Sequence, residues 1–392
     1  MRVLFLCRPY LPTLLGGVPE FLNNLLPALQ NLGVDTTLYS QTKDIHEERL
    51  FGPELLWNKV PYYYGPFLKP RFYLSKKELN PLLNLCKDLS IDLIHSQGIY
   101  RCGFMAKAIK KRSGIPYVLT SHSDIVAANS SRMNRPRILR RTRKIMENAS
   151  HLTHLTPYMA QTAYDICDTS NKSSIIGNGI NTEEWTSITN LPEKDYMLAI
   201  GRLDRTKGFH ILIDAYAELI KTGITTSLVI AGSGKDEKEI HQQARDKGLN
   251  VITNHQDLTA IPPASVVFTG YVTGNLKKEL YGQCKFVLFF AAVEEAFGLV
   301  QLETMAAGKA LIASDVGATR YLQTQGLQAL LVKADDVNAW ANTMQRLLAN
   351  PLQQRTFGQT NLVNAKQFKW QAIAEQYKTV YEKALHSASP LS

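Results

Sequence analysis

The sequence is poor in the features that mark secreted, membrane-spanning or zinc-binding proteins. Its five cysteines are scattered through 392 residues without a C-x-x-C pair, which argues against a disulfide framework or a zinc site and predicts reduced thiols. No apolar run approaches the length that crosses a bilayer. The first apolar run ends at Arg8 and is too short for the core of a signal peptide. Together, these absences predict a cytoplasmic protein.

The common nucleotide-binding fingerprints are also missing. No G-x-G-x-x-G follows an opening strand, because Gly232-Ser233-Gly234 lacks the third glycine, and no P-loop is present. A D-x-D motif for a metal–diphosphate site does not occur either. Any phosphate charge would therefore have to be met by side chains and helix ends, without a metal ion.

The length and the order of apolar segments predict two α/β domains. With 392 residues the chain exceeds one typical core. Strand-like and helix-like segments alternate in two series, which favours parallel sheets covered by helices on both faces. Residues 182–195 lack apolar periodicity and read as a linker. We expect domains at 1–185 and 190–365, with a helical segment at 366–392 that crosses back to the first domain.

The formal charge of +10 is unevenly distributed. Residues 1–190 hold 23 Lys and Arg against 15 Asp and Glu, and many of these cations lie in the run 132–144. A solvated helix face is one interpretation of this run. Another is a patch that contacts anionic membrane, where each basic residue contributes roughly 1 kcal/mol. A nucleic-acid site is disfavoured because no recognised binding motif accompanies the charge.

Residues 286–308 predict a buried strand, a turn with carboxylates, and a helix that begins after Gly298. The free N–H groups and the dipole at such a helix start attract anions. On one helix, Glu295 and Glu303 would stand roughly 12 Å apart. That separation suits the two ends of one long polar ligand better than a single metal ion.

A second candidate stretch is Gly201–Gly208, which directly follows the predicted strand 196–200. The Arg202 guanidinium can donate two parallel hydrogen bonds to phosphate oxygens, and Lys207 supplies a mobile point charge. The alternative is a solvated basic loop. Gly16 and Gly17 precede a predicted helix and could offer N–H groups to an anion, although such a pair is usually only a turn.

Taken in order along the chain, these stretches resemble glycosyltransferase family 4, whose members are retaining enzymes of the GT-B fold. Glu295 and Glu303 match the E-x7-E motif of that family. Nearly the whole chain takes part in the resemblance. The other matching stretches are Gly16-Gly17, Ser121-His122-Ser123, Asn178–Asn181, Gly201–Gly208, Gly270–Val272 and 297–308. The resemblance implies an α/β GT-B fold, with two Rossmann-like doubly wound domains facing a central cleft.

The resemblance implies that the second domain binds the donor. Glu303 would accept hydrogen bonds from both ribose hydroxyls. Glu295 would hold hydroxyls of the donated sugar, helped by the N–H groups of Phe297 and Gly298. Glu294 is also a carboxylate, so either residue could be the first glutamate of the motif. The seven residues between Glu295 and Glu303 favour Glu295.

The remaining roles concern the diphosphate and the base. The N–H groups of Leu299 and Val300 would meet the diphosphate. Arg202 and Lys207 would stabilise the charge that develops on it, in place of a metal ion. Tyr271 and Val272 would border the base.

From the first domain, Gly16 and Gly17 would approach the phosphates closely because they have no side chain. His122 would contact the sugar near its reacting carbon. The alternative for His122 is an interior histidine with a structural role. Asp124, two residues after His122, is a candidate base for the acceptor hydroxyl.

The implied activity is metal-independent transfer of a hexose from a UDP- or GDP-sugar to a hydroxyl of a glycan, glycolipid or small molecule. The first domain would bind the acceptor, and no cofactor or nucleic acid would take part. The basic first domain adds a possible contact with the inner face of an anionic membrane. Two alternatives stay open: a GT-B sugar-nucleotide epimerase, and a non-catalytic GT-B binding subunit.

Overall fold

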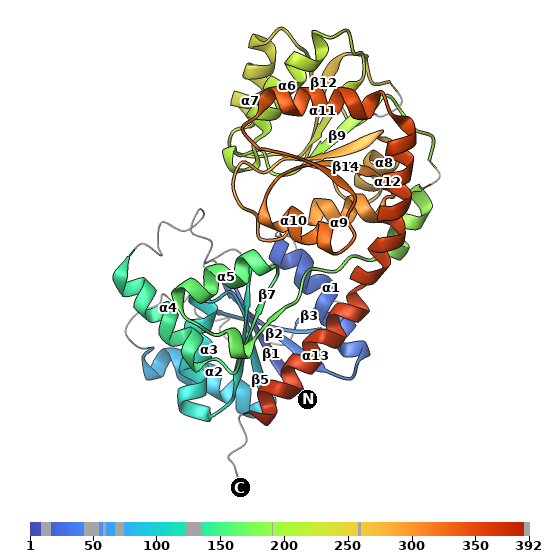
Figure 1. Ribbon diagram of the computed structural model, residues 1–392. Helices are drawn as coiled ribbons and strands as arrows, with labels where there is room; N and C mark the ends of the chain where they lie inside the picture. Colours follow the sequence, from blue (N-terminus) through green and yellow to red (C-terminus); the bar gives the residue numbers. More distant parts are fainter. Residues whose placement is uncertain are drawn as a thin grey trace. The chain divides into compact units, whose positions relative to one another are not determined.

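The computed structural model describes residues 1–8, 17–42, 55–57, 60–66, 74–122, 135–189, 191–257 and 260–387. Its chain divides into two compact units, one of residues 1–179 with 370–392 and the other of residues 180–369 (Figure 1). Each unit consists of a twisted sheet with helices on both faces. The assignment of acceptor binding to the first unit and of donor binding to the second stays a prediction.

The first unit holds a sheet of eight strands in the order β3-β4-β2-β1-β5-β6-β7-β8. Strand β3 runs antiparallel to β4, and the other neighbours are parallel. The strands are β1 (Arg2–Cys7), β2 (Asp35–Thr42), β3 (Leu55–Trp57), β4 (Val60–Pro66), β5 (Leu93–Gln97), β6 (Tyr117–Ser121), β7 (His151–His154) and β8 (Ser173–Ile175). Strands β5, β6 and β7 are buried throughout, as expected for parallel strands covered on both faces.

The helices of this unit are α1 (Gly17–Asn31), α2 (Lys76–Asp88), α3 (Arg101–Ser113), α4 (Pro136–Asn148), α5 (Pro157–Ile166) and α13 (Trp370–His386), with the short turn η3 (Ser170–Lys172). Helices α1 and α13 lie side by side (Figure 1). Phe21 of α1 and Tyr377 of α13 belong to one buried cluster with Phe5 of β1. The last helix of the chain thus completes the core of the first unit.

The second unit holds seven parallel strands in the order β11-β12-β10-β9-β13-β14-β15. They are β9 (Tyr196–Ile200), β10 (Ser227–Ala231), β11 (Asn250–Thr253), β12 (Ser265–Gly270), β13 (Phe286–Phe289), β14 (Ala310–Ser314) and β15 (Ala329–Val332). The helices are α6 (Phe209–Ile220), α7 (Glu237–Asp246), α8 (Gly274–Gln283), α9 (Leu299–Ala306), α10 (Gly317–Thr324), α11 (Val337–Leu348) and α12 (Pro351–Asn364). Three short 3₁₀ segments are η4 (Thr182–Ile188), η5 (Arg205–Lys207) and η6 (Ala365–Phe368).

The predicted doubly wound α/β class is confirmed in both units. Strands β3, β4 and β11 do not stand out as strand-like segments in the sequence. Strand β4 contains Pro61 and Pro66, which are unusual within strands, and β11 is a short edge strand whose residues are partly or fully exposed. Within the described ranges, none of the helices combines the length and the apolarity needed to cross a membrane.

Candidate functional site

The strand order of the second unit reverses beside β9. This strand lies between β10 and β13, and the chain builds the sheet outward from it in opposite directions. In open parallel sheets, ligands bind outside the carboxyl ends of the strands at such a switch point. The stretch Gly201–Gly208 follows β9, and Ala291–Gly298 follows β13. Sheet topology therefore brings both predicted stretches to one edge.

The loop after β9 is held against the loop after β10 by backbone hydrogen bonds. The N–H of Gly201 donates to the carbonyl of Ala231 over 3.0 Å, and that of Leu203 donates to Ser233 over 3.0 Å. A Cβ atom on Gly232 would overlap the Gly201 carbonyl oxygen, and one on Gly234 would overlap that of Leu203. These two glycines are therefore required for the close approach of the loops.

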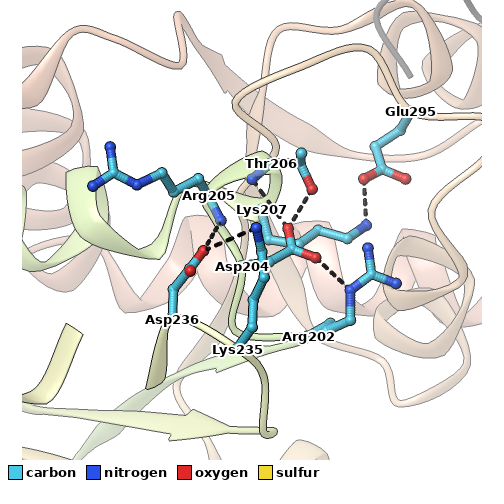
Figure 2. Close-up of polar contacts among 8 residues, drawn as sticks. All are labelled: Arg202, Asp204, Arg205, Thr206, Lys207, Lys235, Asp236 and Glu295. Atoms are coloured by element: carbon cyan, nitrogen blue, oxygen red, sulfur yellow. Dashed lines mark hydrogen bonds and ion pairs between the residues drawn. The ribbon is translucent and has the colours of Figure 1, made fainter. Parts of the chain in front are cut away.

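Asp204 organises the turn η5, which carries Lys207. Its carboxylate accepts hydrogen bonds from the N–H of Thr206 over 3.0 Å, from the Thr206 hydroxyl and from Nε of Arg202 (Figure 2). Burial raises the pKa of Asp204, but the hydrogen bonds from Thr206 and Arg202 outweigh it, and the pKa lies below its ordinary value. Asp204 is thus an ionised carboxylate that fixes the base of the loop.

Lys207 forms an ion pair with Glu295 across the two loops (Figure 2). The side chains are 23% and 17% exposed, so the pair is partly withdrawn from water. The N–H of Ala292 also donates to the carbonyl of Thr206 over 2.9 Å. The Arg202 guanidinium lies beside this pair in Figure 2, and its side chain is 68% exposed. Two cations, Arg202 and Lys207, therefore meet two carboxylates, Asp204 and Glu295, at the switch point.

Glu294 and Glu295 have different environments. Oε2 of Glu294 accepts a hydrogen bond from the N–H of Gly317 over 2.8 Å, at the start of α10. A carboxylate at a helix N-terminus stabilises the unpaired N–H groups and the helix dipole. Of the two, Glu295 is the one that pairs with Lys207; the assignment of Glu295 to the motif stays a prediction.

Helix α9 begins immediately after Gly298, whose φ of 81° is in the left-handed region. A Cβ atom there would lie 2.8 Å from Cζ of Phe289, so glycine is required at this corner. The N–H groups of Leu299 and Val300 stand in the first turn, where a helix offers them no acceptor. Phe297 is buried just before the turn. These residues thus form the start of α9, and anion binding there stays a prediction.

Glu303 lies one turn further along α9 and is 8% exposed. Its Oε2 accepts a hydrogen bond from the Tyr281 hydroxyl over 2.7 Å, and its Oε1 pairs with the Lys277 ammonium. Both partners lie on α8. Burial, followed by the charge of Glu303, raises the pKa of Tyr281. Sequence reasoning did not single out Lys277 and Tyr281; their spacing of four residues, just after Gly270–Val272, was the available signal.

Tyr271 and Val272 connect β12 to α8. Tyr271 is 47% exposed, whereas Val272 is 6% exposed. Gly270 precedes them with a φ of 72° and turns the chain at the carboxyl end of β12. That these two residues border the base stays a prediction.

The candidate residues of the first unit lie at the ends of β5 and β6 and at the start of α1. His122 directly follows β6, and its Nε2 lies 2.7 Å from Oε1 of Gln97 at the end of β5. The Phe21 ring packs edge-on against it at 5.0 Å. Burial lowers the pKa of His122 to about 4, so the imidazole is neutral at pH 7. Gly17 is the first residue of α1. Gly16, Ser123 and Asp124 lie outside the described residues.

Two family models match consecutive parts of the chain. The model described as Glycosyltransferase Family 4 matches residues 15–184, and the model described as Glycosyl transferases group 1 matches residues 181–362. D-inositol 3-phosphate glycosyltransferase from Corynebacterium aurimucosum is 24% identical over 409 residues, covering 96% of this chain and 93% of that protein. An uncharacterized glycosyltransferase from Methanocaldococcus jannaschii is 24% identical over 370 residues, covering 94% and 95%.

Solved structures share the fold over the full length. Sucrose-phosphate synthase from Thermosynechococcus elongatus has a TM-score of 0.77 at 21% identity, covering 99% of this chain and 100% of that chain. Anabaena HepE in complex with UDP and glucose has a TM-score of 0.74 at 20% identity, covering 97% and 99%. The two family models adjoin and span most of the sequence. The chain therefore belongs to glycosyltransferase family 4 and is a glycosyltransferase of the GT-B fold.

Proposed function

We propose that the chain transfers a hexose from a nucleoside diphosphate sugar to an acceptor hydroxyl, with retention of the anomeric configuration and without a metal ion. The observation that carries this proposal is the convergence of Arg202, Lys207 and Glu295 at the switch point of the second sheet. Structures of HepE with UDP and with UDP-glucose support a UDP-sugar as the first donor to test, with a GDP-sugar as the alternative.

The diphosphate would lie between the start of α9 and the two cations. Its oxygens would accept hydrogen bonds from the N–H groups of Leu299 and Val300. Lys207 and Arg202 would offset the negative charge that grows on the leaving diphosphate. Two fixed cations supply there the charge stabilisation that a divalent metal supplies in other transferases. Glu295, adjacent to Lys207, would accept hydrogen bonds from sugar hydroxyls.

In the proposed reaction, the acceptor oxygen forms a bond to the anomeric carbon on the face that the diphosphate leaves. The bond between that carbon and the phosphate oxygen breaks, and its electron pair stays on the diphosphate. The proton of the acceptor hydroxyl passes to the leaving phosphate oxygen. No protein carboxylate becomes bonded to the sugar, and attack and departure on one face retain the configuration.

The ribose would bind at Glu303, which its partners hold in one orientation. The carboxylate oxygens accept from Lys277 and Tyr281, yet each oxygen has a second lone pair for a ribose hydroxyl. Tyr271 and Val272 would border the base. No cofactor besides the donor is required in this scheme.

The acceptor is proposed to bind in the first unit, and to be a sugar, a lipid-linked sugar or a small molecule rather than a nucleic acid. His122 is proposed to contact the donated sugar near its reacting carbon. A neutral imidazole at pH 7 can donate or accept a hydrogen bond to a sugar hydroxyl without charge. All five cysteines are free thiols, which supports a cytoplasmic location, at the inner face of the membrane where the acceptor is a lipid.

The first experiment is a thermal-shift screen of UDP, GDP and their sugars, because a ligand that binds only the folded chain raises its apparent stability. Transfer is then measured for Glu295→Gln, with Glu294→Gln as the matched control one residue away. We expect transfer to be lost in the first variant and retained in the second. Proton NMR of the product reports its anomeric configuration, and assays with EDTA test metal independence. Near-normal turnover by folded Glu295→Gln would overturn the proposed site.

A further inference from the structure

The net charge of this protein resides on two helices of the first unit. Helix α3 together with residues 135–148, which comprise Arg135 and α4, holds eleven Lys and Arg and one Glu. Their formal charge of +10 equals the formal charge of the whole chain. All other residues therefore balance to zero. A neutral protein with one strongly basic face points to a specific anionic partner for that face.

Packing fixes which side of α4 faces water. Thr142, Ile145 and Met146 are buried against the unit. Arg137, Arg140 and Lys144 are exposed and spaced three and four residues apart, so they form one stripe.

Helix α3 lies beside α4 (Figure 1) and adds its own cations to this surface. Nζ of Lys110 donates to the carbonyl of Asn148 over 2.8 Å and joins the ends of the two helices. We call the combined surface the basic face. Its members are Lys107, Lys111, Arg112, Arg135, Arg137, Arg140, Arg143 and Lys144.

The cations of the basic face have no described counter-charge within ion-pair distance. In the second unit, by contrast, Lys207, Lys277 and Lys285 each pair with a glutamate. In the part of the chain that the structure describes, no ion pair joins a carboxylate to a member of the basic face. Burial, followed by the charges of Lys144 and Lys111, lowers the pKa of Lys107, and the charge of Glu147 offsets this only in part. The cations therefore repel one another within the folded chain, and an external anionic surface would relieve that repulsion.

We propose that the basic face docks on the surface of an anionic lipid bilayer. Two helices of 13 residues, each roughly 20 Å long, present their cations over an extended area. The fully exposed positions of α3 and α4 include no aromatic side chain on which a base could stack, and Phe104 of α3 is only partly exposed. Lipid phosphates require only charge, whereas nucleic-acid recognition also uses stacking or base contacts. Docking itself does not depend on the donor site. Together with the proposed transfer activity, docking favours a lipid-linked acceptor, and this conclusion about the acceptor rests on the proposed function.

The test is sedimentation of the whole protein with vesicles of phosphatidylcholine alone and with 30% phosphatidylglycerol. We expect binding only to the anionic vesicles, weakened by added salt. Each basic residue at such a surface contributes about fivefold, so Arg137→Gln/Arg140→Gln/Lys144→Gln should weaken binding about a hundredfold. The control Lys238→Gln/Arg245→Gln/Arg355→Gln removes the same charge from exposed positions of the second unit and should bind like the wild type. Thermal melting checks that both variants fold.

The proposal is overturned by wild-type affinity in the first triple variant, by equal weakening in the control, or by equal binding to neutral vesicles. Binding of a duplex oligonucleotide without binding of anionic vesicles would instead assign the face to nucleic acid. None of these outcomes affects the donor site, because nucleotide-induced thermal shifts are measured without lipid. Failure of docking and failure of the transferase proposal are therefore separate results.

Discussion

In the variant Lys207→Met the side chain keeps its length but loses its charge, and Glu295 loses its ion-pair partner. If Lys207 stabilises the leaving diphosphate, kcat should fall by about 10²–10³, the typical effect of removing one preorganised charge-stabilising group. Glu295 is 17% exposed, and a partly buried carboxylate without its partner costs about 1–3 kcal/mol of stability. The variant should thus be somewhat less stable, still folded, and nearly inactive.

The double variant Lys207→Met/Glu295→Gln separates the structural contribution from the catalytic one. Removing both charges should recover part of the stability lost in Lys207→Met, because no unpaired carboxylate remains. It should not recover transfer, since both groups act on the donor. Urea unfolding followed by circular dichroism gives the stabilities, and initial rates at saturating donor give kcat.

A matched control is Lys221→Met, which breaks the ion pair of Lys221 with Glu218. That pair is 2.7 Å long, and its side chains are 69% and 40% exposed. We expect a change in stability within about 0.5 kcal/mol and unchanged transfer, because exposed ion pairs contribute little. A folded Lys207→Met enzyme whose kcat stays within tenfold of the wild type would refute the assignment of Lys207 to the departing diphosphate.

Three further predictions follow from the described contacts. Tyr281→Phe keeps the ring but removes the hydrogen bond to Glu303. Calorimetry should therefore find UDP binding weakened about tenfold, with a smaller change in kcat. Unchanged affinity would show that Tyr281 does not position Glu303 for the ligand. Gly208→Ala places a Cβ atom in a buried aromatic ring at a φ of 69°, and urea unfolding should show a loss of more than about 2 kcal/mol; a smaller loss would mean that the loop adapts. Burial lowers the pKa of His95 to about 3 and that of His122 to about 4. Between these values and the ordinary 6.5 the unfolded chain binds more protons, so the free energy of unfolding should fall as the pH drops from 7 towards 4; a flat profile would contradict neutral buried histidines.

Local sequence predicted the elements that surround the candidate site. Alternating strand-like and helix-like segments indicated two doubly wound sheets, and the sheet topology agrees. The glycine before α9 marked the start of a helix, which the structure places at Leu299. Such signals are local. A short apolar run indicates a buried parallel strand, and a glycine indicates a turn that other residues adopt poorly, so each pattern is recognised within a few consecutive residues.

Other features depended on packing between distant segments. Glu303 had a predicted role, but its partners Lys277 and Tyr281 belong to no motif and became evident only when α8 was seen beside it. The different environments of Glu294 and Glu295 likewise depend on where α10 begins. Helix propensity and apolar periodicity do not specify such contacts, because the same side chains would also be compatible with an exposed helix face.

The sequence by itself determined that this chain carries an E-x7-E pair, a basic loop after a strand, and a surplus of positive charge in its first half. Only the tertiary structure decided that Lys207 and Glu295, 88 residues apart, form an ion pair, and that the surplus charge lies on two adjacent helices. The physical reason is that spacing along the chain fixes the local elements. Which elements become neighbours is set by strand order and by the burial of apolar faces across the whole unit.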